Sequence, residues 1–163
     1  MTTEHRNLAA YDNSWYDPGR GFVVRTIWYY VSAMIFESGC FPVSGFKAAI
    51  LRLFGARIGA GLVIRPHVRI KYPWKLTVGD HCWIGQEVWI DNLENVTLGD
   101  NVCISQAAYL CTGSHNHRSP TFELIVKPIL IGDGAWLAAR CTILQGAIIG
   151  PGVVVPACSI VKK

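Results

Sequence analysis

Charged residues are scarce in this chain: Asp, Glu, Lys and Arg make up 16% of its 163 residues, against roughly 25% in an ordinary globular domain. Hydrophobic residues make up 51%, which excludes a disordered chain, because such chains are rich in charge and poor in apolar residues. The net charge of +4 is too small to indicate a partner nucleic acid. We expect one domain with a substantial hydrophobic core.

Long apolar runs are also missing. The longest candidate covers residues 26–36 and ends at Glu37, well short of the roughly 18 residues that a membrane-spanning helix needs. Glu4, Arg6 and Asp12 lie near the N-terminus with no apolar stretch between them, so no signal peptide is predicted. These absences predict a cytoplasmic protein.

The six cysteines contain no C-x-x-C pair, the spacing typical of a zinc ribbon or a thioredoxin-type motif. We therefore interpret them as reduced cysteines that serve as small apolar residues. They are Cys40, Cys82, Cys103, Cys111, Cys141 and Cys158.

What the chain has in abundance is a six-residue repeat. From Ile58 onward an Ile, Leu or Val returns every six positions, in sets of three, often followed by glycine. A period of six fits neither a helix nor a long strand. It fits a short strand and a turn, three times per coil of a β-solenoid whose stacked coils share one core. The repeat positions are Ile58, Ile64, Ile70, Val78, Ile84, Ile90, Leu98, Ile104, Leu110, Ile131, Leu137, Ile143, Ile149, Val155 and Val161.

This [LIV]-G-x-x-x-x pattern resembles that of the hexapeptide-repeat acyltransferases. Four segments, LRLFGARIG (51–59), IRP (64–66), YPWKLT (72–77) and ISQAAYLCTGSH (104–115), further resemble the colanic acid biosynthesis acetyltransferases, which are relatives of the maltose and galactoside O-acetyltransferases. The resemblance implies an all-β fold, a left-handed parallel β-helix over residues 58–163. An N-terminal arm and helical cap are expected over residues 1–57.

The coil lengths locate an insertion. The coils that begin at Ile58 and Val78 are 20 residues long, whereas the coil that begins at Leu98 is 33 residues long. The excess forms one long inserted loop over residues 111–130. Insertions on a solenoid tend to build its binding face, so we expect the active site here.

Acetyl transfer from a thioester to a hydroxyl group needs a base that works near pH 7, and histidine is the usual choice. The resemblance places the catalytic histidine just after Thr-Gly in the inserted loop, which corresponds to His115. His117 is the alternative base. His67 and His81 lie in repeat turns, where we interpret them as solvated or packed residues.

Polar residues at a neighbouring corner are candidates for binding the acceptor. Asp91, Asn92 and Glu94 follow Ile90, one coil before the root of the inserted loop. We expect them to stack beneath that root, where they either bind sugar hydroxyls or are simply solvated.

The resemblance also assigns the acetyl-CoA site, and it implies no metal. It implies that the backbone amides of Ala139 and Ala157, one coil apart, contact the thioester carbonyl and the pantetheine. Trp136 resembles a tryptophan beside the same channel, with ordinary corner packing as the alternative. Because His115 and Ala139 follow different strands of a coil, one chain would hold them at different corners. A homotrimer, which the resemblance implies, would bring them together between neighbouring chains.

The segment before the solenoid is of another kind. Residues 44–54 are predicted to form a short amphipathic helix, with Ser44 as N-cap and Gly55 just past its end. Residues 22–36 are aromatic-rich and helical or mixed. Two interpretations are open: a lid over the end of the solenoid, or a peripheral contact with the inner membrane. Residues 1–19 are predicted to form a loose or extended arm.

The resemblance therefore implies an acetyl-CoA-dependent O-acetyltransferase that acts on a sugar hydroxyl in exopolysaccharide or cell-surface polysaccharide biosynthesis. Its relatives continue past the last coil, so the end at Lys163 predicts either a truncated chain or an incomplete coenzyme site. Three alternatives stay open. The acceptor is an amino sugar or an antibiotic, the solenoid is a non-catalytic scaffold, or the protein is a γ-carbonic-anhydrase-like enzyme with His81, His115 and His117 as metal ligands.

Overall fold

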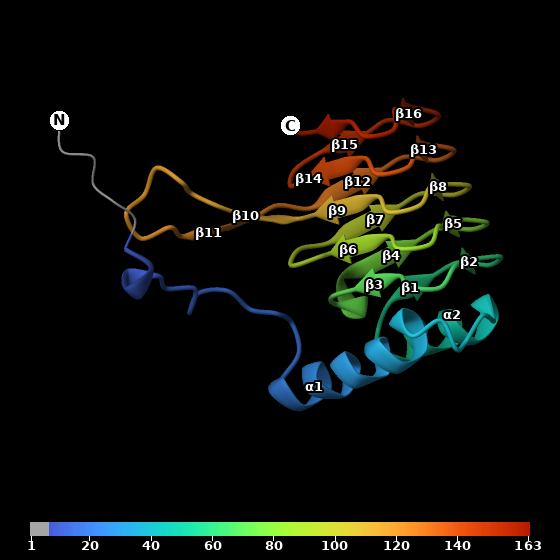
Figure 1. The fold of residues 1–163 in the computed structure, drawn as a ribbon, viewed down its shortest axis with the longest axis horizontal. Helices are drawn as coiled ribbons and strands as arrows, with labels where there is room; N and C mark the ends of the chain where they lie inside the picture. Colours follow the sequence, from blue (N-terminus) through green and yellow to red (C-terminus); the bar gives the residue numbers. More distant parts are fainter. Residues whose placement is uncertain (1–6) are drawn as a thin grey trace.

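The computed structural model describes residues 7–163, and most of them form a three-sided solenoid (Figure 1). Each side is a five-stranded parallel sheet. Sheet A contains β1 (Arg57–Ile58), β4 (Leu76–Val78), β7 (Val96–Leu98), β12 (Ile129–Ile131) and β15 (Ile148–Ile149). Sheet B contains β2 (Val63–Ile64), β5 (Trp83–Ile84), β8 (Cys103–Ile104), β13 (Trp136–Leu137) and β16 (Val154–Val155). Sheet C contains β3 (Arg69–Ile70), β6 (Trp89–Asp91), β9 (Tyr109–Cys111), β14 (Thr142–Leu144) and β17 (Ile160–Val161).

The six-residue repeat sets the register of these sheets. In sheet B, Ile64 pairs with Ile84, Ile84 with Ile104, and Ile104 with Leu137. The repeat positions before Val161 are all buried, and Val161, at the open end, is half-buried. The fold is the predicted left-handed parallel β-helix, with about five coils. Cys82 and Cys141 are fully buried in its core, as expected for apolar filling residues. The same interpretation is wrong for Cys40 and Cys158, which are exposed.

The corner between sheets A and B is closed by a ladder of aspartates. The side-chain Oδ1 of Asp80 accepts from the amide of Ala60 at 2.6 Å, and Asp100 and Asp133 repeat this contact one and two coils further on. Each aspartate thus satisfies a turn amide in the coil before it, because the Gly-Asp pair recurs once per coil.

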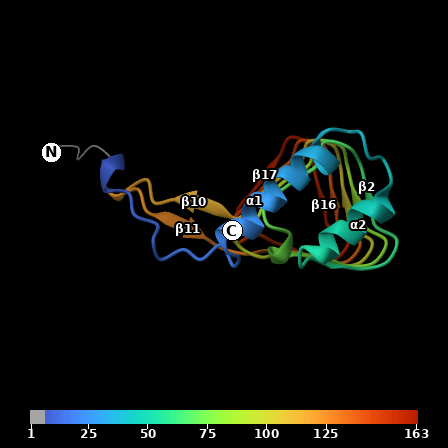
Figure 2. The same ribbon diagram turned by 90° about the horizontal axis from the view of Figure 1, so that it is seen from below.

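Helices cover the lower end of the solenoid (Figure 2). They are α1 (Phe22–Val31), the π-helix η2 (Ser32–Glu37) and α2 (Ser44–Leu53), with short 3-10 turns at η1 (Leu8–Ala10) and η3 (Pro73–Lys75). Trp28, Phe36 and Leu51 are buried against the first coil. These helices therefore pack on the first coil and cover this end of the solenoid. No helix among the described residues is long and apolar enough to span a bilayer.

The predicted helix over residues 44–54 is α2, but its N-cap is Val43 rather than Ser44. Ser44 is the first helical residue, and its hydroxyl accepts from the amide of Ile64 at 3.1 Å. The hydroxyl therefore joins the helix to the solenoid instead of capping the helix. Gly55 adopts a φ of +95° just past the C-terminus, as the sequence predicts.

The inserted segment is a β-hairpin that leaves the corner between sheets C and A and projects away from the solenoid (Figures 1 and 2). Its antiparallel strands are β10 (Gly113–His115) and β11 (Leu124–Val126). The N-terminal arm, from its first described residue, is extended along this hairpin rather than loose. The amide of Asn7 donates to the Pro120 carbonyl at 2.9 Å, and Trp74 Nε1 donates to the Pro18 carbonyl at 2.7 Å.

Candidate active site

His115 is the last residue of β10 and is held on two sides. Its Nδ1 lies 2.9 Å from the carbonyl oxygen of Phe122. Because a carbonyl oxygen only accepts, we assign the ring proton to Nδ1, which leaves Nε2 with a free lone pair. The Phe122 ring also stacks on the imidazole, with centroids 4.3 Å apart and planes 4° from parallel. This is the arrangement that a general base requires.

Phe122 occupies an uncommon backbone conformation. Its φ is +50°, in the left-handed region that a bulky residue seldom adopts. Phe122 supplies both the carbonyl oxygen and the aromatic ring that hold His115, so the strained residue is in direct contact with the candidate base. Local strain of about 1–3 kcal/mol that persists at such a place is typical of functional sites.

A cavity of about 570 Å³ adjoins His115. It lies between the N-terminal arm, the hairpin and the first two coils, and its lining includes Tyr11, Tyr16, Tyr72 and Leu124. The Tyr11 ring is 5.6 Å from the imidazole, centroid to centroid. Burial raises the pKa of the Tyr16 phenol, which stays protonated and donates to the Leu93 carbonyl at 2.6 Å. The arm is therefore a wall of the candidate site.

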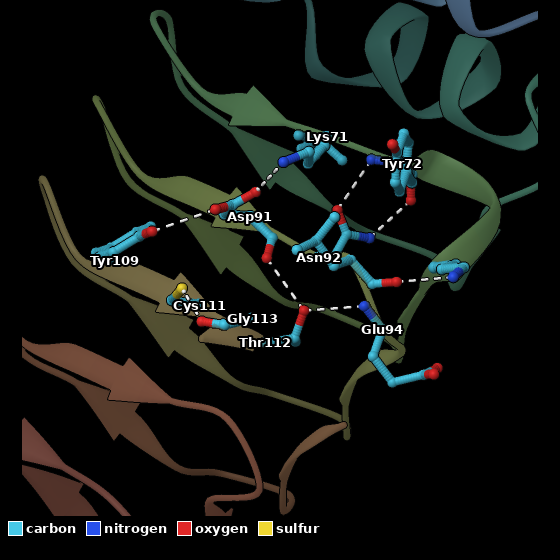
Figure 3. A network of polar contacts seen from close by, with 12 residues as sticks. Lys71, Tyr72, Asp91, Asn92, Glu94, Tyr109, Cys111, Thr112 and Gly113 are labelled. Carbon is cyan, nitrogen blue, oxygen red and sulfur yellow. Dashed lines mark hydrogen bonds and ion pairs between the residues drawn. The ribbon is translucent and has the colours of Figure 1, made fainter. Parts of the chain in front are cut away.

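A polar network fixes the root of the hairpin on the coil below it (Figure 3). Thr112 is fully buried; its hydroxyl donates to the Asp91 carbonyl at 3.1 Å and accepts from the Glu94 amide at 2.9 Å. The Asp91 carboxylate pairs with Lys71 Nζ at 3.0 Å and accepts from the Tyr109 hydroxyl at 3.2 Å. Burial, with the Cys111 thiol and Asp91 nearby, raises the pKa of Tyr109, so this phenol remains a donor.

The three residues predicted to bind the acceptor have different surroundings in this network. Asp91 lines a second cavity beside that of His115. Asn92 is completely buried, and its amide donates to the Tyr72 carbonyl at 2.7 Å and accepts from the Tyr72 amide at 2.9 Å. The prediction that Asn92 binds the acceptor sugar is therefore wrong, because both ends of its side-chain amide hydrogen-bond to the backbone of the coil beneath. Glu94 is half-buried, and its Oε1 accepts from the amide and side chain of Asn95, both at 2.7 Å.

The other histidines lie apart from this cavity. His117 is exposed near the tip of the hairpin. His81 is exposed in a turn between sheets A and B, and His67 Nδ1 lies 2.6 Å from the Glu37 carbonyl. Over residues 7–163 no three His, Cys, Asp or Glu side chains gather in a way that could hold a metal ion. The set His81, His115 and His117 is therefore not assembled within one chain.

The corner between sheets B and C differs from the aspartate-lined corner. At the same turn position in successive coils, four backbone amides donate to no acceptor in the described part of the chain; they belong to Gln86, Gln106, Ala139 and Ala157. The predicted coenzyme residues Ala139 and Ala157 are the two highest members of this column. The column offers free N–H donors one coil apart, which suits the carbonyl and amide groups of a pantetheine arm.

Trp136 lies on the outer face of sheet B, just before this corner. The residue is 47% exposed, and its Nε1 donates to the Ser105 hydroxyl at 2.8 Å. It lines a shallow cavity of about 290 Å³ together with Trp83 and Arg65. The ring is therefore available to a ligand that runs along the sheet towards Ala139.

The buried thiols do not favour a covalent acetyl-enzyme. Burial raises the pKa of Cys82 and of Cys141, so both remain protonated thiols near neutral pH. A protonated thiol is a poor nucleophile. His115 is thus the better candidate for the reacting group.

Several residues around the site were not predicted from the sequence. Tyr11 and Arg25 come from the arm and from α1, far from the hairpin in sequence, and Thr112 looked like an ordinary residue of the motif. No repeat register places the arm or cap beside the hairpin. A Tyr-rich arm and a lone Arg in an apolar helix were the available signals.

The chain matches models of hexapeptide-repeat families. The bacterial transferase hexapeptide model (six repeats) matches residues 128–163, and the model for the hexapeptide repeat of succinyl-transferase matches residues 75–109. The chain is 47% identical over 137 residues to a protein of Escherichia coli (strain K12) provisionally named a colanic acid biosynthesis acetyltransferase, WcaF. That match covers 84% of this chain and 75% of the relative.

More distant relatives agree with this match. The galactoside O-acetyltransferase of the same strain is 28% identical over 120 residues, covering 72% of this chain and 59% of that protein. A hexapeptide-repeat acetyltransferase from Vibrio cholerae, solved with acetyl coenzyme A, superposes with a TM-score of 0.76 at 26% identity, covering 86% of this chain and 76% of the other. These findings confirm the resemblance on which the sequence interpretation rests.

Proposed function

Because this chain belongs to the hexapeptide-repeat acetyltransferases, in the branch of the colanic acid biosynthesis enzymes, we propose that it acetylates a sugar hydroxyl in the biosynthesis of a surface polysaccharide. Acetyl-CoA is the acetyl donor. The observation that carries the proposal is the imidazole of His115, which is anchored at Nδ1, free at Nε2 and adjacent to a cavity of about 570 Å³. That volume is within the range of small-molecule sites.

In the proposed reaction Nε2 of His115 takes the proton of the acceptor hydroxyl while its oxygen attacks the acetyl carbonyl. A C–O bond forms and the C–S bond of the thioester breaks when the tetrahedral intermediate collapses. The imidazolium returns its proton to the leaving thiolate, so His115 ends the cycle neutral. The carbonyl of Phe122 keeps the imidazole in the required tautomer throughout.

The free amides of Ala139 and Ala157 provide the donor side of the proposed site. The Ala139 N–H donates to the developing oxyanion, and the Ala157 N–H, one coil further on, contacts the pantetheine. An amide that donates to no protein group can stabilise such charge without losing another hydrogen bond. Trp136 flanks the path of the same arm on sheet B.

We further propose that the active enzyme is a homotrimer. The hairpin with His115 leaves the corner between sheets C and A, whereas Ala139 lies at the corner between B and C. Sheet C separates the two groups within one chain. A neighbouring chain that presents its own Ala139 to the hairpin would complete the site.

A peripheral contact with the inner membrane is proposed for the outer side of the cap. The exposed basic residues of segment 20–57 are Arg20, Arg52 and Arg57, against one acidic residue, Glu37, a balance that suits anionic lipid. Exposed apolar side chains cover the same helices; they are Phe22, Ile27, Tyr30, Met34, Phe46 and Leu53. Such a patch on a soluble domain typically marks an interaction surface.

Vesicle sedimentation tests this contact. The protein is expected to sediment with anionic phospholipid vesicles but not with neutral ones, and Leu53→Glu should weaken sedimentation because Leu53 is 82% exposed on α2. Leu8→Glu, which adds the same charge at an exposed residue outside the cap, is the matched control. Equal recovery in the supernatant with both vesicle types would refute the membrane contact and leave the enzymatic proposal untouched.

The enzymatic proposal is tested by thiol release from acetyl-CoA in the presence of nucleotide sugars and oligosaccharides. Acceptor-dependent release, with an alkali-labile acetyl ester on the product, is expected. An acetamide product would favour an amino-sugar acceptor instead. No release with any acceptor and no binding of coenzyme A would favour the scaffold alternative.

A further inference from the structure

The cavity beside His115 adjoins a second cavity of about 290 Å³, which lies between α1 and the first two coils. The two cavities share three lining residues: Arg25, Lys71 and Tyr72. The second cavity is walled by Tyr29 of α1 and Trp89 of β6. A ligand whose hydroxyl reaches His115 can therefore extend past Arg25 into a space that would accept a further group or sugar ring.

Arg25 is the charged group in this space that lacks a partner. Its Nε is buried without a hydrogen-bond partner, and its guanidinium makes no hydrogen bond or ion pair within the described residues. The neighbouring cations are engaged: Lys71 pairs with Asp91 at 3.0 Å, and the Arg69 guanidinium lies over the Trp89 ring, 4.5 Å from its centroid.

The acids of the second cavity are engaged as well. Asp91 holds Lys71 and accepts from Tyr109, and Glu37 accepts from the Ser32 hydroxyl at 3.0 Å. Neither acid hydrogen-bonds or pairs with Arg25. The positive charge at the junction of the two cavities is therefore uncompensated by a direct contact.

Arg25 also lies where the dipole of its helix disfavours a positive charge. It is the fourth residue of α1, in a first turn with no acidic residue. A cation near a helix N-terminus is disfavoured by the helix dipole. A residue that contributes neither to capping nor to an ion pair, yet lines both cavities, is better explained by a ligand than by folding.

We propose that Arg25 forms an anion subsite for the acceptor, an inference that rests on the proposed function. The enzyme would then acetylate a saccharide that bears a carboxylate or a phosphate near the reacting hydroxyl. The planar guanidinium matches both anions through paired N–H donors. Tyr29 lines the second cavity and Tyr72 lines both cavities, so aromatic side chains flank the space on either side of Arg25. The cap thus supplies a specificity-determining residue in addition to closing the solenoid.

The test compares matched acceptors in the full-length protein. Steady-state acetyl transfer is measured with methyl glucoside, methyl glucuronide and glucose 1-phosphate, for the wild type, Arg25→Gln and Arg25→Lys. We expect a lower KM for at least one anionic acceptor, and Arg25→Gln should raise that KM about ten-fold or more with kcat little changed. Arg25→Lys should restore part of the effect. The KM for methyl glucoside should not change.

The acceptor arms also distinguish the two sources of negative charge. Preference for the glucuronide identifies a uronic acid, and preference for glucose 1-phosphate identifies a phosphorylated sugar. Arg57→Gln, at an exposed arginine on β1, is the control and should match the wild type with all three acceptors. Sedimentation of each variant checks that the oligomeric state is unchanged.

Two results would overturn this inference. One is an equal KM for neutral and anionic acceptors; the other is an Arg25→Gln effect of the same size on all three. Titration calorimetry with glucuronate and with glucose 1-phosphate keeps the test independent of turnover. If no acetyl is transferred but either anion binds and Arg25→Gln abolishes binding, the proposed function fails and the subsite stands. If turnover occurs and neither anion binds, the subsite fails alone.

Discussion

At the residue scale, the active-site assignment depends on how one imidazole is held. His115 and His117 are two residues apart on the same hairpin and share the same local composition. Only His115 has its Nδ1 on a backbone carbonyl and a ring stacked on its face, whereas His117 is exposed. A base must present one nitrogen in a fixed direction, so the difference in their surroundings predicts a difference in function.

His115→Ala should lower kcat by about 10²–10⁴-fold, because removal of a positioned general base typically has that effect. His117→Ala should remain within about three-fold of the wild type, since an exposed tip residue makes no transition-state contact. Acceptor-dependent thiol release measures both, and circular dichroism checks the fold. The reverse order of effects would transfer the role of base to His117.

A second prediction concerns a single backbone N–H. Pro66 occupies, in the first coil, the turn position that Ala139 occupies three coils later, so the turn accepts proline there. Ala139→Pro should remove the proposed oxyanion donor without altering the fold and lower kcat by about 10²–10³-fold. Ala157→Pro should mainly raise the KM for acetyl-CoA.

Gln86→Pro is the matched control for this experiment, since it deletes an amide of the same column two coils below Ala139. It should leave kcat and both KM values close to those of the wild type. If Ala139→Pro and Gln86→Pro behaved alike, the effect would belong to the turn and not to catalysis.

At the scale of elements, the Gly-Asp corners tolerate no side chain at glycine. A Cβ on Gly79 would come within 2.6 Å of the Gly99 carbonyl carbon in the next coil, which is backbone and cannot move aside. Gly79→Ala should therefore lower the free energy of unfolding by about 3 kcal/mol. A Cβ on Gly45 in α2 would meet nothing within 4 Å.

Gly45→Ala is accordingly expected to raise stability by about 0.5–1 kcal/mol, because alanine is the better helix former. Urea unfolding of both variants gives the comparison. If Gly79→Ala were as stable as the wild type, neighbouring coils could move apart at this corner, and the close contact between Gly79 and Gly99 would not be essential.

The same scale shows what the sequence could predict. Repeat residues such as Ile84 and Ile104 recur at a fixed spacing, so coil number, register and core followed directly from the sequence. The hairpin and the arm have no such period, because their contacts join residues such as Asn7 and Pro120 that are far apart along the chain. His115 could be proposed from its motif, whereas Arg25 and Phe122 gained meaning only from packing.

Asn92, in contrast, was predicted to bind the acceptor and does not have that role. A polar residue at a solenoid corner resembles a ligand in the sequence, yet its amide fits the backbone of Tyr72 in the coil below. Side-chain ladders between coils and ligand contacts use the same residue types. Sequence spacing alone therefore could not separate Asn92 from Asp91, which does line a cavity.

At the scale of the whole molecule, the two halves of the proposed site lie at different corners of one solenoid, and this makes the trimer testable by complementation. His115→Ala destroys the base but keeps the amide column, and Ala139→Pro does the reverse. Each variant alone should keep at most about 1% of wild-type activity. Since a shared site takes its base from one chain and its amide from the next, co-expressed variants should regain up to about a quarter of wild-type activity.

That figure follows from random assembly, because a site is intact only when an Ala139→Pro chain supplies His115 and a His115→Ala neighbour supplies Ala139. Mixing the purified homotrimers without chain exchange is the control, and it should restore nothing. A site within one chain would give no recovery in either mixture, since every site would then carry one of the two defects. Recovery on co-expression alone would thus show that the hairpin of one chain reacts at the amide column of its neighbour.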